Sequence, residues 1–198
     1  RKSFRISIGR RLLLVLILSV DIFTILSLNL RYFYDSITFN RRHFFFFMRV
    51  DQHIHIIDRI LKETDLKVIL LGGPEDAERN NEIANAFPLE IISTPTNEGV
   101  RMGAVYESLA DIIVTGDSFG MHLGIALEKY IVSWFGLSCW TEIDLYDNGV
   151  MFYPENLECA PCWKKTCPFN LECIDQINLD GMFNAVVRAA VEITLNRV

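Results

Sequence analysis

Residues 111–136 read DIIVTGDSFGMHLGIALEKYIVSWFG, with an apolar, β-branched run at each end. The first run, DIIVTGD, and the second, YIVSWFG, each have the length of a short buried strand. The segment from Gly120 to Lys129 between them is typical of a helix. A strand, a helix and a strand at this spacing predict two parallel strands joined by a right-handed crossover.

The same alternation extends to both sides of this unit. Upstream, KVILLGG (67–73) is a strand-like run closed by two glycines, and LEIIS (89–93) is a further strand. We expect helices from about Gln52 to KETDLK, in PEDAERNNEIANAF (74–87), in GVRMGAVYESLA (99–110) and from Leu179 to Leu195. This order predicts an α/β fold, a Rossmann-like parallel sheet with helices on both faces.

Apolar positions at helical spacing indicate which helix faces turn inward. The first helix places Ile54, Ile57, Ile60 and Leu61 on one face. The helix in residues 99–110 places Val100, Ala104, Leu109 and Ala110 on its inner side. We expect both sets to pack against the sheet.

Charge is distributed unevenly along the chain. Residues 1–50 carry nine Lys and Arg against two Asp, a net of +7, so the overall charge of −6 leaves −13 for the remainder. The acidic remainder lacks the basic surface that a nucleic acid requires, so we expect no nucleic-acid partner. The contrast favours two units: a basic, apolar segment of uncertain structure (1–50) and a Rossmann-like domain (51–198) with a Cys-rich loop at 157–174.

The run from Leu12 to Leu30 has nearly the length of a membrane span, but Asp21 stands at its centre. A central Asp costs about 2.5 to 3.5 kcal/mol on insertion scales, which makes the sum only marginally favourable. The preceding basic residues would also hold the N-terminus inside and export the acidic domain. We therefore favour a buried or peripheral segment and a cytoplasmic location, with contact to the inner membrane surface left open.

Polar residues gather in residues 117–122, the polar junction, where the strand DIIVTGD ends and a helix begins. Ligands of open parallel sheets bind at such places, because free amides and the positive end of the helix dipole favour an anion. Gly120 allows close backbone approach, Ser118 can cap the helix or donate to a phosphate oxygen, and His122 can direct a ring N–H to the same place. Asp117 would repel phosphate, so we assign it to bracing the loop or to a ligand hydroxyl.

A purely structural interpretation of the polar junction is the alternative. A strand–Asp–Ser–helix sequence is ordinary N-capping. A single His in the first turn of a helix is often just a satisfied polar residue. Composition and spacing leave both interpretations open.

Three stretches together carry a family resemblance: VILLGGPEDAERNNEIA (68–84), ADIIVTGDSFGMHLGIALEKYIVSWFG (110–136) and EIDLY (142–146). They resemble the C-terminal domain of heptosyltransferase-like glycosyltransferases, the family nine group with the two-domain GT-B architecture. The resemblance extends from about Ile56 to the end and rests most on the D-[ST]-x-x-M-H-L pattern. The later LECAPCWKKTCPFNLECIDQI (157–177) is similar to a Cys-rich tail found in part of the family.

This resemblance implies a glycosyltransferase. Members of the family transfer a sugar, typically heptose from ADP-heptose, to a lipid-linked saccharide acceptor in lipopolysaccharide biosynthesis. Their C-terminal domain holds the nucleotide-sugar, and the residues of the polar junction contact its diphosphate. The implied donor-site residues are Asp117, Ser118, Phe119, Gly120, Met121 and His122, with Glu75 or Glu78 near the nucleotide.

Two features depart from the family pattern. Many members have Gly directly after Asp-Ser/Thr, whereas Phe119 here precedes Gly120. A GT-B enzyme also needs an N-terminal domain that binds the acceptor and supplies an acidic base, and residues 1–50 are too few for one. We therefore expect a donor-binding part of an enzyme, with its catalytic residues unassigned.

Four of the five cysteines have the spacing C-x2-C-x4-C-x5-C; they are Cys159, Cys162, Cys167 and Cys173. Four thiolates could form a tetrahedral zinc site or hold an iron–sulfur cluster, and we expect no other cofactor. Reduced thiols in a loop, or two disulfides in an oxidising setting, are the alternatives.

Two other classes of function compete with the glycosyltransferase. One is a non-catalytic interaction module that binds metal through the four cysteines on a Rossmann-like scaffold. The other is a dinucleotide dehydrogenase, which is disfavoured because LLGGPED lacks the G-x-G-x-x-G pattern.

Overall fold

A six-stranded, fully parallel sheet forms the centre of the fold in the computed structural model, which describes residues 13–17, 48–164 and 167–196. The strand order is β3-β2-β1-β4-β5-β6, and every neighbouring pair is parallel. The strands are β1 (Leu13–Ile17), β2 (Lys67–Leu71), β3 (Ile92–Ser93), β4 (Ile112–Gly116), β5 (Tyr130–Trp134) and β6 (Gly149–Phe152).

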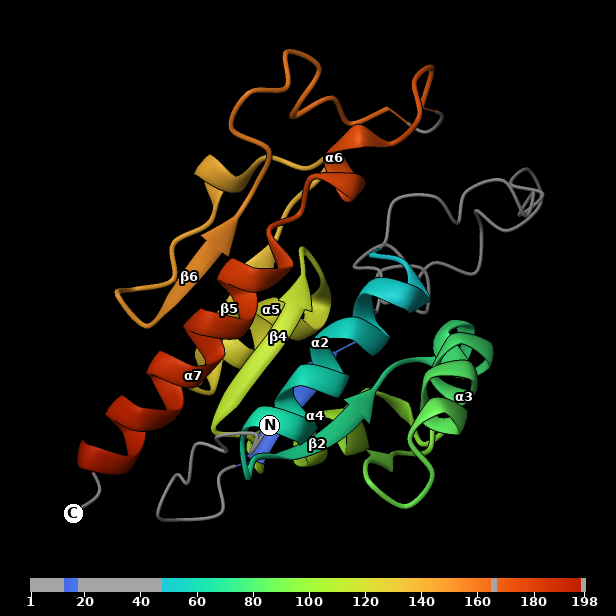
Figure 1. Cartoon of the computed structure of the whole chain (residues 1–198), viewed down its shortest axis with the longest axis vertical. Coiled ribbons are helices and arrows are strands. Elements are labelled where there is room, and N and C mark those ends of the chain that lie inside the picture. The colour runs from blue at the N-terminus through green and yellow to red at the C-terminus, as the bar shows by residue number, and fades with distance from the viewer. Residues whose placement is uncertain (1–12, 18–47, 165–166, 197–198) are drawn as a thin grey trace, which may run out of the picture.

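Helices cover both faces of this sheet, as the sequence predicts. They are α2 (Val50–Glu63), α3 (Ala77–Ala86), α4 (Gly99–Ser108), α5 (Phe119–Ala126), α6 (Glu172–Asp175) and α7 (Leu179–Asn196), with short 3-10 turns η2 (Pro74–Asp76) and η3 (Trp140–Glu142). One core cluster joins α2, α3 and α7 to the sheet, and a second joins α4 and α5 to the opposite face. Figure 1 shows α2 and α7 in front of the sheet and α5 behind it.

Side-chain alternation along the strands explains this three-layer arrangement. In β2, Val68 and Leu70 enter the first cluster, whereas Ile69 and Leu71 enter the second. Successive side chains of a strand point to opposite faces, so a continuously apolar strand can be buried on both. The apolar run KVILL is therefore the sequence of an interior strand.

Strand β1 is an element that the sequence analysis did not assign as a strand. Leu13–Ile17 lies at the middle of the sheet and pairs with β2 on one side and with β4 on the other. The rest of the Leu12–Leu30 run lies outside the described residues. In the part of the chain that the structure describes, no helix has the length and apolar character needed to cross a membrane.

Two further details differ from the sequence prediction. The strand expected at 89–93 is formed only by Ile92–Ser93, because Leu89 has a positive φ of 66° and is fully exposed. On α4, Val100 and Leu109 are 41% and 59% exposed instead of facing inward. Val100 follows Gly99, which has a φ of 79°, and Leu109 is the C-cap, so neither lies in the regular middle of the helix.

The predicted inner face of α2 is confirmed. Ile57 and Ile60 are fully buried, and Ile54 and Leu61 pack against the same cluster while partly buried. The helices at 99–108, 119–126 and 179–196 also agree with prediction to within a few residues.

Glu107 occupies the inner side of α4 instead and is only 2% exposed. Its Oε1 has no hydrogen-bond partner among the described residues, and a Cβ at Gly124 of α5 would lie 3.0 Å from it. Burial raises the pKa of this carboxyl to about 8, opposed by the charge of Lys129. The carboxyl is therefore protonated in the folded protein at neutral pH.

We expect Glu107→Gln to remove a pH-dependent loss of stability. The usual pKa of 4.5 applies to the unfolded chain, so between pH 4.5 and about 8 only the unfolded state releases the proton, and wild-type stability falls as pH rises. The variant should gain on the order of 2–4 kcal/mol relative to wild type across that interval. Urea denaturation at several pH values measures this difference; the exposed Glu90→Gln is the control, and a constant difference would contradict the assignment.

Candidate functional site

The polar junction lies at the carboxyl edge of the sheet, between the end of β4 and the start of α5. Ser118 is the N-cap of α5: its Oγ accepts a hydrogen bond from the Met121 amide at 3.2 Å. The same Oγ lies 2.9 Å from Thr115 Oγ1, and Ser118 is 3% exposed. The hydroxyl is thus fully engaged within the protein, so of the two roles considered for Ser118 the structure shows the cap.

Two amides at the start of α5 have no acceptor among the described residues; they are those of Phe119 and Gly120. Such amides, together with the positive end of the helix dipole, favour an anion. Gly120 is buried, and Phe119 is partly exposed. The backbone of the polar junction therefore retains its capacity to bind an anion.

His122 and Asp117 are the two exposed side chains of the polar junction. His122 Nε2 lies 3.9 Å from Asp117 Oδ1, and 42% and 25% of these side chains are exposed. Met121, in contrast, is fully buried in the core that α5 shares with the sheet. Of the six predicted residues, His122 and Asp117 can reach a ligand with their side chains, while Ser118 and Met121 hold α5 in place.

Two packed side-chain rings, those of Trp134 and His53, lie beside the end of β4. A Cβ at Gly116 would lie 3.1 Å from the Trp134 ring, so only glycine fits there without displacement. His53 meets the same ring edge-on, with centroids 5.8 Å apart. Burial lowers the pKa of His53 to about 3, so the imidazole is uncharged; its Nδ1 lies 2.9 Å from the carbonyl oxygen of Arg49.

A second group of polar residues follows β2. Asp76 is 3% exposed, its Oδ2 accepts a hydrogen bond from the Gly73 amide at 2.9 Å, and its Oδ1 pairs with Arg79. Burial raises the pKa of Asp76 to about 7, and the positive charge of Arg79 opposes this shift. The sequence analysis missed this pair; the GGPED turn gave the position of a loop but no sign that one of its acids is buried.

Glu75 and Glu78 line a cavity of about 390 Å³ beside this turn. The other walls come from the start of α2, from α3 and from the segment before α6, and they include Arg49, Arg79 and Leu171. The volume lies within the range of about 300–1,000 Å³ that small-molecule sites have. The structure therefore places both predicted glutamates at a cavity large enough for a nucleoside.

The cavity and the polar junction lie along the same edge of the sheet. In a parallel sheet all carboxyl ends of the strands meet at one edge, and here only β1 separates β2 from β4 (Figure 1). Ligand sites of open α/β sheets occupy this edge. The two groups of residues thus flank the carboxyl end of β1.

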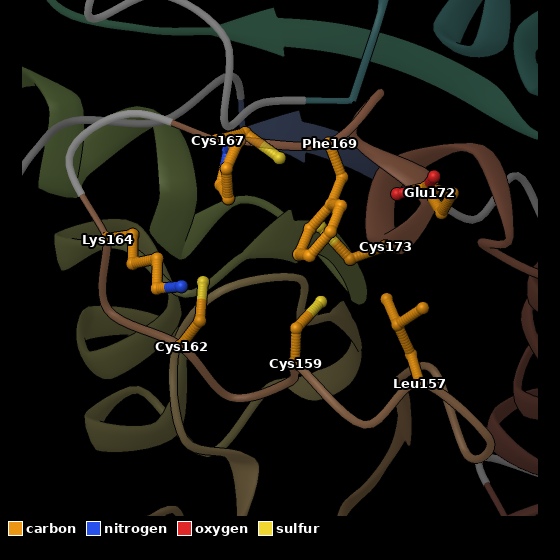
Figure 2. A pocket seen from close by; sticks show the side chains of 9 residues that line it. Leu157, Cys159, Cys162, Lys164, Cys167, Phe169, Glu172 and Cys173 are labelled. Carbon is orange, nitrogen blue, oxygen red and sulfur yellow. The ribbon is translucent and has the colours of Figure 1, made fainter.

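The four clustered cysteines also converge, on the loop between β6 and α7. Cys159, Cys162, Cys167 and Cys173 line one cavity of about 10 Å³, and Figure 2 shows them on facing segments around it. All five cysteines are free thiols, and burial raises the pKa of Cys173 to about 11. As these side chains stand, no three His, Cys, Asp or Glu among the described residues form a ready metal-binding set.

A parallel α/β sheet with a cavity and a helix start along its carboxyl edge is an architecture in which nucleotide-binding domains hold their ligands. Residues 54–172 match glycosyltransferase family 9 (heptosyltransferase), and the chain belongs to this family. A putative glycosyltransferase of Haemophilus influenzae is 26% identical over 144 residues, which cover 69% of this chain and 40% of that protein.

Solved structures share the fold. ADP-heptose lps heptosyltransferase II of E. coli has a TM-score of 0.66 at 14% identity, over 93% of this chain and 48% of its own. A family 9 glycosyl transferase of Veillonella parvula has a TM-score of 0.62 at 16% identity, over 91% and 46%. E. coli heptosyltransferase WaaC with ADP has a TM-score of 0.58 at 15% identity, over 88% and 43%. The chain therefore spans less than half the length of these relatives.

We expect Ser118→Ala to lower the free energy of unfolding by about 1–2 kcal/mol, because α5 loses its cap. Ser108→Ala is the matched control, since its exposed Oγ donates only to the Val105 carbonyl oxygen in the structure. Urea denaturation measures both variants. Equal decreases in the free energy of unfolding for the two variants would show that the N-cap of α5 is not the cause of the loss.

Proposed function

We propose that this chain binds a nucleotide diphosphate sugar at the carboxyl edge of its sheet, as the donor-binding part of a glycosyltransferase. The observation that carries the proposal is the start of α5: it lies at the edge of the sheet that also holds the larger cavity, and it combines the exposed imidazole of His122 with two amides that have no acceptor in the described part of the chain. Family 9 membership supports this hypothesis over the metal-binding module and the dehydrogenase.

The diphosphate is assigned to the polar junction. The Phe119 amide and the dipole of α5 would attract phosphate oxygens, and His122 would donate a ring N–H to them. Asp117 would orient the imidazole across the 3.9 Å that separates the two side chains and would hold the donor nitrogen toward the ligand. A carboxylate in this role stays beside the phosphates without contacting them.

The nucleoside is assigned to the larger cavity. Carboxylates accept hydrogen bonds from hydroxyl groups, so Glu75 and Glu78 are suited to the two hydroxyls of a ribose. Arg49 and Arg79 keep the cavity from being uniformly acidic. ADP is the first nucleotide to test, because E. coli heptosyltransferase WaaC has been solved with ADP.

The full reaction would transfer a heptose-like sugar to lipopolysaccharide or to another saccharide acceptor, as the family resemblance implies. Transfer needs an aligned acceptor hydroxyl and a general base, and we assign neither to the described residues. Nucleotide-sugars of this kind are cytosolic, so we place the protein in the cytoplasm, where it would meet a lipid-linked acceptor at the inner membrane surface.

We expect calorimetry to detect binding of ADP to the full chain, with UDP and GDP as comparisons. His122→Ala should weaken it by about 1–3 kcal/mol, roughly 5- to 150-fold in Kd, because a hydrogen bond to phosphate is lost. His55→Ala, on the exposed side of α2, is the control. Absence of binding by all three nucleotides, or an equal effect of both histidine variants, would refute the proposed site.

We expect Glu75→Gln and Glu78→Gln to weaken ADP binding by roughly tenfold while leaving inorganic pyrophosphate binding unchanged. The reason is that these carboxylates contact the nucleoside and not the diphosphate. His122→Ala should weaken both ligands. If the glutamate variants also altered pyrophosphate binding, the division of the ligand between the two groups of residues would be wrong.

A further inference from the structure

Four thiols from two facing segments of the loop between β6 and α7 surround one small cavity. Cys159 and Cys162 come from the first segment, and Cys167 and Cys173 from the second (Figure 2). Lys164 lines the same cavity. The fifth cysteine, Cys139, lies elsewhere, with its Sγ 3.1 Å from Thr141 Oγ1.

The backbone holds the first segment in place for this convergence. The amides of Cys162 and Trp163 both donate to the carbonyl oxygen of Leu137, at 3.0 and 3.1 Å. Trp163 has a positive φ of 51°, which turns the chain back on itself. The first segment is therefore anchored to the residues that follow β5.

The second segment is anchored to the same place. Leu171 has a positive φ of 62°, and its carbonyl oxygen accepts the amides of Ile174 and Asp175 at 2.8 and 3.2 Å. Cys173 is 8% exposed, and a Cβ at Gly136 would lie 3.4 Å from its Sγ. Cys162 and Cys173 are thus both held beside the stretch after β5, at Leu137 and Gly136, and the other two thiols line the same cavity.

We propose that Cys159, Cys162, Cys167 and Cys173 bind a single Zn²⁺ ion through their four Sγ atoms. Four thiolates are a ligand set that zinc takes tetrahedrally, at Zn–S distances of about 2.3 Å. The cavity of about 10 Å³ is close to the space of one water molecule, so it suits one ion and not a multi-iron cluster. Lys164 at the cavity would offset part of the negative charge of four thiolates.

Binding would draw the sulfurs inward. A tetrahedral site with these bond lengths separates its sulfurs by about 3.8 Å, and the free thiols are not arranged as a ready set. Each thiol must also release its proton on binding, so affinity rises with pH. The required movement is confined to four short side chains and to the loop that carries them.

A zinc ion here would also stabilise a wall of the larger cavity. Leu171 and Ile174 line that cavity; Ile174 follows Cys173 directly, and Leu171 precedes it by two residues. Gln52 of α2 donates to the Ile174 carbonyl oxygen at 3.0 Å, and Arg49 pairs with Asp175. The metal site would therefore fix the segment that closes the cavity, although zinc binding itself requires no nucleotide.

The test is metal analysis of the full chain, reduced, reconstituted with zinc and freed of excess metal. We expect about one zinc per chain, and thiolate-to-metal charge-transfer bands when Co²⁺ replaces it. Cys162→Ser and Cys167→Ser, both at partly exposed positions, should lose the zinc, while the control Cys139→Ser keeps it. Circular dichroism of each variant shows that loss of zinc is not loss of the fold.

Thiol labelling gives an independent readout. With zinc bound, we expect only Cys139 to react rapidly, and a chelator should expose all five thiols. No zinc in protein with five free thiols, two disulfides without metal, or iron with sulfide in the purified protein would each overturn the proposal. None of these results depends on whether ADP binds, so the zinc site and the proposed donor site can fail separately.

Discussion

The close packing of α5 on the sheet is the constraint on which the polar junction depends. A Cβ at Gly124 would lie 2.6 Å from Ile113 Cδ1 and 2.8 Å from Ile131 Cδ1, so the helix approaches β4 and β5 more closely than a residue with a side chain would allow. Met121 buries the first turn of the helix on the same face. Core packing thereby fixes where the amides of the helix start are presented, and the anion-binding capacity follows from that position.

The two groups of residues along the edge differ in chemistry, and this difference is the basis of the proposed division of a nucleotide between them. The start of α5 offers amides and an imidazole, which suit phosphate oxygens. The cavity beside β2 offers carboxylates, which accept hydrogen bonds from hydroxyl groups, together with the cations Arg49 and Arg79. Because β1 separates them in the sheet, the acids stand away from the helix start and would not cancel its attraction for an anion.

The sequence predicted those strands and helices whose apolar residues recur at the strand or helix period. The run IIVTG and the apolar face of α2 were identified because strand and helix periods are visible in them. β1 was missed because LLVLI lies inside a longer apolar run with no turn residues to mark its ends. The cap was one of the two roles that the sequence offered for Ser118, and the structure decides between them because the hydroxyl is buried and bonded within the protein. The Asp76–Arg79 pair depends on burial, and the convergence of the cysteines depends on tertiary structure, neither of which spacing alone can reveal.

The wall of the larger cavity shows how distant parts of the chain become one site. Its α2 side and its α6 side are joined by the contact of Gln52 with the Ile174 carbonyl oxygen and by the Arg49–Asp175 pair, which is largely exposed. Exposed ion pairs contribute little to stability, typically below about 1 kcal/mol. The α6 side is therefore held mainly by burial: Ile174 is 1% exposed, lies in the core cluster that also contains Ile57 of α2, and accepts the Gln52 hydrogen bond through its carbonyl oxygen.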